Sequence, residues 1–355
     1  MGADIGLLRF KPLCFERIWG GRKLRDTFGL DAPADQPVGE AWLVADHPQC
    51  ESVVVEGPFA GRTLRELLRE DSSAILGTRA ELTIHGRFPL LLKLLDAAEV
   101  LSVQVHPNDD TAAELGEPDV GKTEMWYVLD AEPGSELICG LTPHASRENL
   151  AQAVADGTVE TLMNRFPVQV GSAIFVPAGM VHAIGAGILL AEIQQNSDLT
   201  YRLYDWGRLE SDGRPRALHV DKALPVIDFT PVSGLAHPLI LESQGIRREV
   251  LAACRYFATE RLAVDGSLER RIGGTTVHIL LAVTGTLTVS AGPDEAQLNP
   301  GQAVLVAGGR KAFVIDGSGT VIDYYVPDLQ QDIAQPLRAC GHSEADIARL
   351  IASTV

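Results

Sequence analysis

Short runs of strand-forming residues, separated by glycine and proline, make up most of this chain, and this pattern restricts its fold more than any other feature. Glycine occurs 34 times and proline 20 times among the 355 residues. Clear examples of such runs are residues 51–55, 101–106, 125–129 and 172–176. Many short strands joined by Gly- and Pro-rich turns are typical of a β-sandwich or β-barrel. The sequence therefore predicts a mainly β protein.

Helical patterns are fewer. Thr63 and Glu66 have the spacing of a capping box ahead of an apolar run, which predicts a short helix. Residues 147–166 carry apolar side chains at mostly helical spacing, and residues 343–353 begin with Ser-x-x-Asp before an apolar pattern. We expect a small helical insertion at residues 147–166 and a terminal helix at residues 343–353.

The charge balance and the cysteines restrict partners and compartment. The chain has 30 Lys and Arg against 47 Asp and Glu, a net charge of −17, which disfavours nucleic acid and membrane surfaces as partners. A local basic pocket can still bind a small phosphate. The five cysteines include no Cys-x-x-Cys pair, and neither a signal peptide nor an apolar run of about 18 residues is evident. We expect a cytoplasmic protein.

The sharpest local motif lies between residues 171 and 182. It has glycine, five residues, proline, one residue, glycine, two residues and histidine, at positions Gly171, Pro177, Gly179 and His182. This spacing resembles the second signature of the cupin family, in which the histidine begins a returning strand with its ring inside a small barrel. The alternative is a β-turn followed by an ordinary core histidine.

A first metal-binding segment is expected upstream. Gln104 and His106 lie two residues apart on a predicted strand, so their side chains leave the same face, and the same rule applies to Lys122 and Glu124. Two imidazoles, one carboxylate and one amide oxygen suit Zn²⁺, with Mn²⁺, Fe²⁺ or Co²⁺ as alternatives, and leave positions open for water or substrate. Taken singly, His106 is equally compatible with a surface loop and Glu124 with a solvated strand.

Four motifs, taken in order, resemble those of the type I mannose-6-phosphate isomerases, in the shorter bacterial branch. These motifs are residues 104–109, 121–127, 177–184 and 192–206. The resemblance covers about residues 8–230 and includes residues 18–21 and 89–93. It implies a metal-dependent isomerase that interconverts mannose 6-phosphate and fructose 6-phosphate, with one Zn²⁺ per chain.

The resemblance also implies roles for individual residues. The implied metal ligands are Gln104, His106, Glu124 and His182. The implied catalytic residues are Arg202 and Lys122, and the implied substrate contacts are Trp19, Lys93 and Ser102. Enzymes of the longer branch have a histidine where this chain has Gly121, so any role of that histidine must fall here to another group or to water.

The implied reaction accounts for these residue types. Isomerisation removes a proton beside a carbonyl and returns it to the neighbouring carbon, so negative charge develops on the oxygens of an enediol. A divalent cation and the guanidinium of Arg202 would stabilise that charge. The base is open between a metal-bound water, Lys122 and an acidic residue such as Asp198. The alternative for Arg202 is a surface arginine paired with Asp198 or Asp205.

Two other functions are compatible with the motifs. One is a non-catalytic cupin that binds or senses a sugar phosphate, and it would not exchange the C2 proton of its ligand with solvent. The other is a cupin dioxygenase that uses Fe²⁺ and consumes oxygen, for which residues 192–206 have no explanation.

The C-terminal half repeats the strand pattern without the ligands. Residues 299–314 have the rhythm of the segment at Gly171, but no histidine stands near Ala312, where His182 would recur. We expect a degenerate, metal-free cupin domain whose interior is filled by Ile279, Leu281, Val304 and Val306. The predicted segments are a catalytic cupin domain at 1–230, a linker at 231–244, the degenerate domain at 245–327 and a tail with a short helix at 328–355.

Overall fold

The structure is a computed structural model that describes residues 5–32, 36–210, 213–230, 235, 237–243 and 245–351. It is mainly β, as predicted, and its strands form antiparallel sheets. The chain divides into two compact units. Unit 1 comprises Met1–Leu13, Trp42–Leu92 and Ala236–Val355, and unit 2 comprises Cys14–Ala41 and Lys93–Leu235.

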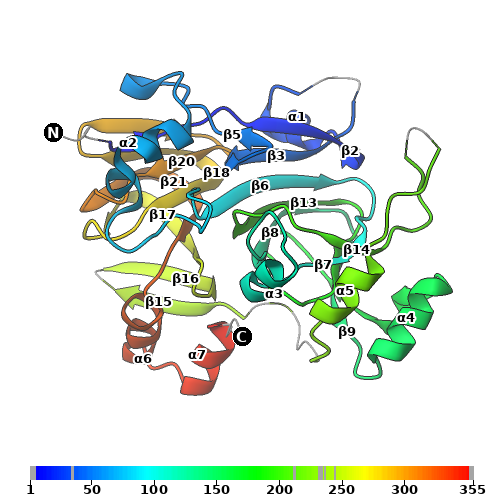
Figure 1. The fold of residues 1–355 in the computed structure, drawn as a ribbon. Coiled ribbons are helices and arrows are strands. Elements are labelled where there is room, and N and C mark those ends of the chain that lie inside the picture. The colour runs from blue at the N-terminus through cyan, green and yellow to red at the C-terminus, as the bar shows by residue number, and fades with distance from the viewer. Residues whose placement is uncertain are drawn as a thin grey trace. The chain divides into compact units, whose positions relative to one another are not determined.

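Two sheets frame the chain between residues 13 and 204 (Figure 1). One has five strands in the order β10-β9-β12-β7-β14, and the other has six in the order β11-β8-β13-β6-β2-β3. The strands of the first sheet are β7 (Val103–Val105), β9 (Glu136–Leu141), β10 (Met163–Pro167), β12 (His182–Ile184) and β14 (Tyr201–Tyr204). Those of the second are β2 (Leu13–Gly21), β3 (Val38–Val44), β6 (Leu90–Ala97), β8 (Glu124–Ala131), β11 (Ala173–Val176) and β13 (Ile188–Gln195).

The five-stranded sheet is buried on both faces. On its outer face, Val103 and Val105 pack in one cluster with Leu150 and Ala223. These two come from helices α4 (Arg147–Ala155) and α5 (Val220–Val226), which lie beside β9 and β14 in Figure 1. Its inner face packs in a second cluster with the six-stranded sheet. Because side chains alternate along a strand, Gln104 lies on the inner face, between two valines that face outward.

The predicted helical insertion is helical only in its first part. Helix α4 starts after a capping box of Ser146 and Asn149 and ends at Ala155. Gly157 then adopts a φ of +69°, and after a 3-10 turn, η2 (Val159–Leu162), the chain forms strand β10, which pairs with β9. The helix prediction was therefore wrong for Met163–Phe166, because the left-handed glycine ends the helix and the following apolar residues alternate along a strand.

The predicted reversal before His182 is confirmed. Gly179 has a φ of +88°, a left-handed conformation that favours glycine, and the backbone N–H of Met180 donates to the carbonyl of Pro177 at 3.1 Å. The turn brings His182 into β12, directly opposite Gln104 of β7.

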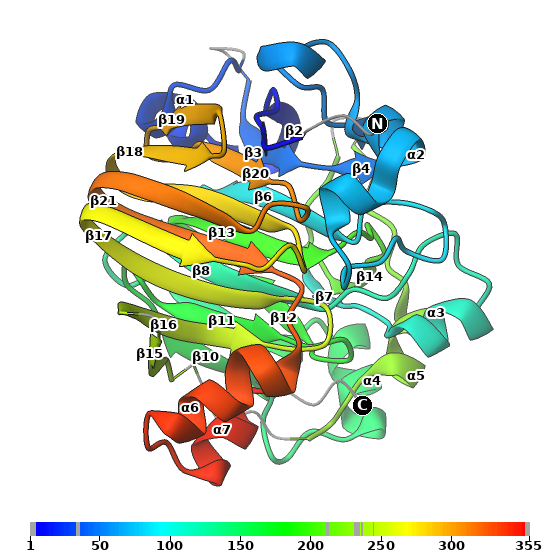
Figure 2. The ribbon, with the colours of Figure 1, turned by 90° about the vertical axis from the view of Figure 1, so that its left-hand side faces the viewer.

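Unit 1 contains an eight-stranded antiparallel sheet in the order β1-β20-β18-β21-β17-β16-β15, with β19 paired to β18. Figure 2 shows β18, β21, β17 and β16 side by side. The strands are β1 (Leu7–Leu8), β15 (Leu239–Ser243), β16 (Ile246–Ala253), β17 (Ala258–Arg271), β18 (His278–Ala291), β19 (Asp294–Leu298), β20 (Ala303–Val306) and β21 (Ala312–Tyr325). A short separate ladder joins β4 (Asp46–His47) to β5 (Cys50–Glu51).

The remaining helices are short. Those of unit 1 are η1 (Gly57–Phe59), α2 (Leu64–Leu76), η3 (Leu329–Ala334), α6 (Gln335–Ala339) and α7 (Glu344–Leu350), and those of unit 2 are α1 (Lys23–Phe28) and α3 (Asp109–Glu114), in addition to α4, α5 and η2. The predicted capping box of Thr63 and Glu66 is confirmed at the start of α2. Ser343 caps α7, as expected of the terminal helix, and residues 352–353 of that prediction lie outside the described residues.

The predicted linker, residues 231–244, contains strand β15. Residues 231–234, 236 and 244 of that segment lie outside the described part of the chain. The chain passes from unit 2 to unit 1 within it, after Leu235, and unit 1 also includes Trp42–Leu92.

The predicted interior of the C-terminal half needs correction. Val304 pairs with Leu280, and the inner apolar cluster contains Leu280 and Ala282 together with Val304 and Val306. Ile279 and Leu281 are buried, but they alternate with these residues and so lie on the opposite face of the sheet. A choice of register that is wrong by one residue places every side chain of a strand on the wrong face.

Candidate active site

Three buried side chains of unit 2 converge in the manner of metal ligands. His106 follows β7, Glu124 opens β8 and His182 opens β12. The Nε2 atom of each histidine lies 3.5 Å from a different carboxylate oxygen of Glu124, and the potential ligand atoms of all three lie within 4.8 Å of one another. Among the described residues, no other group of three or more His, Cys, Asp or Glu side chains could hold a metal ion in this way.

Backbone carbonyls fix the orientation of both imidazole rings. Nδ1 of His106 lies 2.7 Å from the carbonyl oxygen of Leu199, and Nδ1 of His182 lies 2.8 Å from that of Met180. Since a carbonyl only accepts hydrogen bonds, each Nδ1 carries the proton and each Nε2 presents a lone pair toward Glu124. Burial lowers the pKa of both rings, to about 4 for His182, so both imidazoles are neutral and could bind a metal ion.

Glu124 is the charge around which the site is built. Its side chain is fully buried, at 0% exposure. A buried carboxylate requires a cation nearby. Here the ammonium of Lys122 lies 2.6 Å from Oε2. Burial opposes the charge on Lys122, but the carboxylates of Glu124 and Glu192 outweigh it and raise the pKa of the lysine.

Gln104 lies beside these ligands. It occupies one rung of the sheet, with His182 opposite on β12 and Arg202 opposite on β14. Its Nε2 atom is 3.3 Å from Nε2 of His182, and its Oε1 atom is 3.4 Å from the hydroxyl of Ser102. An amide binds a metal through oxygen, so Gln104 could act as a ligand only after a half-turn of the amide that exchanges these two atoms.

A cavity of about 400 Å³ opens next to the metal ligands. The predicted residues Trp19, Lys93, Ser102, Gln104, Lys122 and Arg202 all line it. It is also lined by Asp198, a candidate base, and by charged residues that the sequence analysis did not single out: Arg17, Glu40, Glu192 and Arg216. Two of these had a sequence signal, because Arg17 lies two residues before Trp19 on β2 and Glu192 opens the fourth motif.

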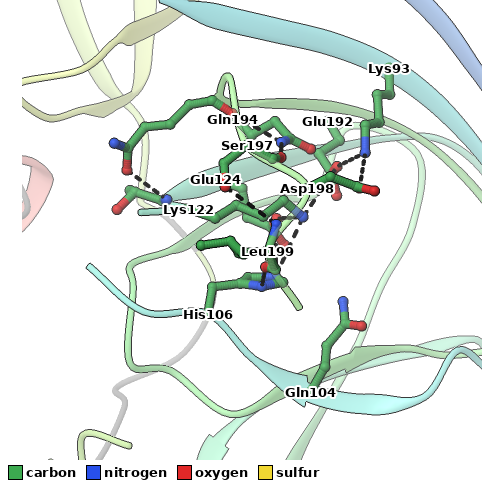
Figure 3. Close-up of polar contacts among 12 residues, drawn as sticks. Lys93, Gln104, His106, Lys122, Glu124, Glu192, Gln194, Ser197, Asp198 and Leu199 are labelled. Carbon is green, nitrogen blue, oxygen red and sulfur yellow. Dashed lines mark hydrogen bonds and ion pairs between the residues drawn. The ribbon is translucent and has the colours of Figure 1, made fainter. Parts of the chain in front are cut away.

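Ion pairs hold the charged lining of the cavity in place (Figure 3). The ammonium of Lys93 lies 3.8 Å from a carboxylate oxygen of Glu40, of Glu192 and of Asp198. Glu192 also accepts a hydrogen bond from the indole N–H of Trp126 at 2.9 Å. Burial and the nearby carboxylate of Glu124 raise the pKa of Glu192.

Arg202 is directed into this cavity. Its Nη1 group donates to the carbonyl of Ala217 at 2.9 Å, and its buried Nε–H has no hydrogen-bond partner among the described residues. The alternative of a surface pair with Asp198 or Asp205 is not what the structure contains, because Asp198 lies 3.8 Å from Lys93 and Asp205 pairs with Arg208 and Arg216. A buried N–H without a partner costs free energy.

Gly121 leaves no space for a side chain. A Cβ atom at this position would lie 2.5 Å from the carbonyl carbon of Asn108 and 2.5 Å from the backbone nitrogen of Asp109. The N–H of Gly121 donates to the side chain of Asp109 at 2.9 Å. The histidine expected here in longer relatives is therefore excluded by the local backbone.

A small antiparallel barrel that directs two histidines and a glutamate into one buried site defines a metal-site enzyme of the cupin class. A family model described as phosphomannose isomerase type I, catalytic domain, matches residues 7–147. The chain is 36% identical to a mannose-6-phosphate isomerase of Streptococcus mutans over 86% of this chain and 94% of that protein. It belongs to the type I phosphomannose isomerase family.

Two further relatives agree with this assignment. The chain is 41% identical to a mannose-6-phosphate isomerase of Bacillus subtilis over 73% of this chain and 80% of the relative. A crystal structure of the mannose 6-phosphate isomerase from Bacillus subtilis superposes with a TM-score of 0.82 at 34% identity, covering 90% of this chain and 99% of that one.

The ligand arrangement predicts the effect of removing one histidine. His182→Ala should lower the bound metal to well below one ion per chain, because His106, Glu124 and His182 must converge together to hold an open-coordinated ion and an amide such as Gln104 does not replace an imidazole. Cys139→Ala is the matched control, since Cys139 is buried directly opposite His182 on β9 and is not a ligand. Elemental analysis of both purified variants measures the outcome, and full metal content in His182→Ala would contradict the assignment.

Proposed function

We propose that this protein interconverts mannose 6-phosphate and fructose 6-phosphate by moving a proton between C1 and C2 through an enediol. The observation that carries the proposal is the carboxyl group of Glu124, which is buried between two neutral imidazoles next to a cavity with cationic side chains in its wall. Family membership supports the same reaction. The cytoplasmic location expected from the sequence stays a prediction.

The metal that fits the site best is Zn²⁺, one per chain, held by His106, Glu124 and His182. Ligand atoms about 2.0–2.1 Å from a tetrahedral Zn²⁺ lie roughly 3.4 Å apart. This value is close to the 3.5 Å between Nε2 of His106 and one carboxylate oxygen of Glu124, and to the 3.5 Å between Nε2 of His182 and the other oxygen. Gln104 is the proposed fourth ligand, through its amide oxygen. When bound, the ion acts as a Lewis acid toward the oxygens of the substrate.

Arg202 would stabilise the negative charge of the enediol. Its guanidinium lies next to Gln104 on the inner rung and lines the cavity, and its one side-chain hydrogen bond to a described residue uses Nη1. A donor directed at the position where charge develops lowers the barrier without improving ground-state binding to the same extent. Lys122 and Asp198 both line the same cavity as candidates for moving the proton.

The remaining cavity residues would bind the sugar phosphate. Arg17 and Arg216 give the cavity two further guanidinium groups inside a chain of net charge −17. These groups suit a phosphate, which accepts bidentate hydrogen bonds from arginine. Trp19 and Ser102 offer an apolar ring and a hydroxyl to the sugar, and Lys93 offers an ammonium.

Proton exchange with solvent separates catalysis from binding alone. In heavy water, the zinc-loaded protein should convert mannose 6-phosphate into fructose 6-phosphate and replace the C2 proton by deuterium, because the proton leaves carbon during the reaction. Proton NMR follows both changes in one sample. A protein that binds mannose 6-phosphate and neither converts it nor exchanges the proton would be a non-catalytic sugar-phosphate cupin, and this proposal would be wrong.

Arg202 provides a second test. Arg202→Ala should lower kcat by about 10²- to 10⁴-fold with a much smaller change in KM, since the lost interaction is made mainly with the transition state. Arg214→Ala, an exposed arginine outside the cavity lining, is the control and should leave both constants unchanged. Steady-state kinetics with mannose 6-phosphate measures both variants. An unchanged kcat in Arg202→Ala would show that this arginine is structural.

A further inference from the structure

A second cavity lies within unit 1, with a volume of about 150 Å³. Strands β15 to β18 and β21, the segment after β17, and helices η3 and α6 all contribute to it. Among the described residues that line it, Asp332 has the one carboxylate. Its possible hydrogen-bond donors are Arg79, Ser243, Arg248, Arg270, Arg271, Thr275, Thr276, His278, Tyr325 and Gln331. No lining residue is shared with the active-site cavity.

A buried carboxylate behind the wall fixes two of the arginines. Glu260 of β17 is fully buried and accepts hydrogen bonds from Arg248 at 2.8 Å, Arg270 at 2.5 Å and the hydroxyl of Tyr325 at 2.7 Å. Burial opposes the charge on Glu260, but the two guanidinium groups outweigh it and hold the pKa of this carboxyl at about 2. Glu260 is therefore ionised, and both guanidinium groups are held in one geometry.

A second buried carboxylate completes this arrangement. Asp323 of β21 pairs in register with Glu260 and lies 2.7 Å from Nδ1 of His278 and 3.1 Å from Nε of Arg270. The guanidinium of Arg270 thus lies between two buried carboxylates, 5.2 Å from the ring centre of Tyr325. Neither Glu260 nor Asp323 lines the cavity, whereas Arg248 and Arg270, which they bind, both do.

The guanidinium groups keep donors available for a ligand. Within the described part of the chain, the side-chain contacts of Arg248 use Nη1, and those of Arg270 use Nε and Nη1. The remaining N–H groups are Nε and Nη2 of Arg248 and Nη2 of Arg270, and both residues line the cavity. At its rim, Arg79 pairs with Asp332, and Arg271 is exposed and lies 3.5 Å from Glu269.

We propose that this cavity is a binding site for a phosphate group. Guanidinium groups from three separate segments converge on it, namely Arg79 after α2, Arg248 on β16, and Arg270 with Arg271 on β17. Donors from several directions suit a tetrahedral anion better than a planar carboxylate. The volume is several times the roughly 30 Å³ that one water occupies in the liquid. A phosphate group therefore fits.

Other classes of ligand suit the cavity less well. A metal cation would be repelled by the arginines, and Arg270 already supplies the positive charge between the two buried carboxylates. An apolar ligand would bury the N–H groups of Arg248 and Arg270 without partners, which costs free energy. This binding site is additional to the isomerase reaction, and it does not require that the reaction be assigned correctly.

Hydrogen–deuterium exchange of the full-length, zinc-loaded protein tests the proposal, because it locates binding along the chain. Inorganic phosphate should slow amide exchange in residues 245–249 and 270–278, and this protection should saturate with phosphate concentration. Arg248→Gln should raise the concentration for half-maximal protection by about tenfold or more, since it removes hydrogen bonds to a charged ligand. Arg247→Gln, the exposed neighbour outside this cavity, should respond as the parent protein does.

Further probes distinguish the sources of the phosphate group. Sorbitol 6-phosphate is a suitable second probe because it has no carbonyl to isomerise. Protection by both sorbitol 6-phosphate and inorganic phosphate would identify the ligand as a phosphate ester. Protection by inorganic phosphate alone would identify the ligand as the free ion. Arg271→Gln, at the exposed rim, tests the same cavity if Arg248→Gln does not fold, and it should weaken protection as well. Absence of protection by both phosphate probes, equal protection by acetate, or unchanged protection in a folded Arg248→Gln protein would overturn the proposal.

Discussion

The buried carboxylate of Glu124 is the charge on which the active site depends. It lies at the start of β8, and two neutral imidazoles direct their lone pairs toward it. Such a group is expensive to bury without a cation, so the fold keeps Lys122 at 2.6 Å and leaves a set of ligands that suits a divalent ion. The same cluster adjoins the cavity whose wall contains Arg202.

The two units use different cations to stabilise buried carboxylates. In unit 2, Glu124 faces two histidines and a lysine, an arrangement that can exchange the ammonium for a metal ion. In unit 1, the guanidinium of Arg270 lies permanently between Glu260 and Asp323. Arg270 makes ion pairs with both carboxylates and also lines a cavity, so one side chain both neutralises the buried charges and forms part of the cavity wall. The described residues of the C-terminal half therefore keep a polar cluster in the interior.

The sequence predicted the mainly β fold, the turn at Gly179 and the residues that converge near Glu124, because each depends on local spacing. It did not predict Arg216, since no motif connects that residue to β14 or β2 before the chain folds. It failed at Ile279 and Leu281 because a fully buried strand has no polar alternation to indicate which face is inside. Glu260 and Asp323 were missed because a charged residue within a strand normally indicates a solvent-exposed face.

The most direct test of this account is a metal titration of the protein after a chelator has removed its metal. Activity with mannose 6-phosphate should be lost in the metal-free protein and return in proportion to added Zn²⁺. The recovered activity should level off when one Zn²⁺ ion has been added per chain, because His106, Glu124 and His182 form a single site. Full activity in the metal-free protein, or activity that returns only after more than one ion has bound to each chain, would contradict the central role assigned to Glu124.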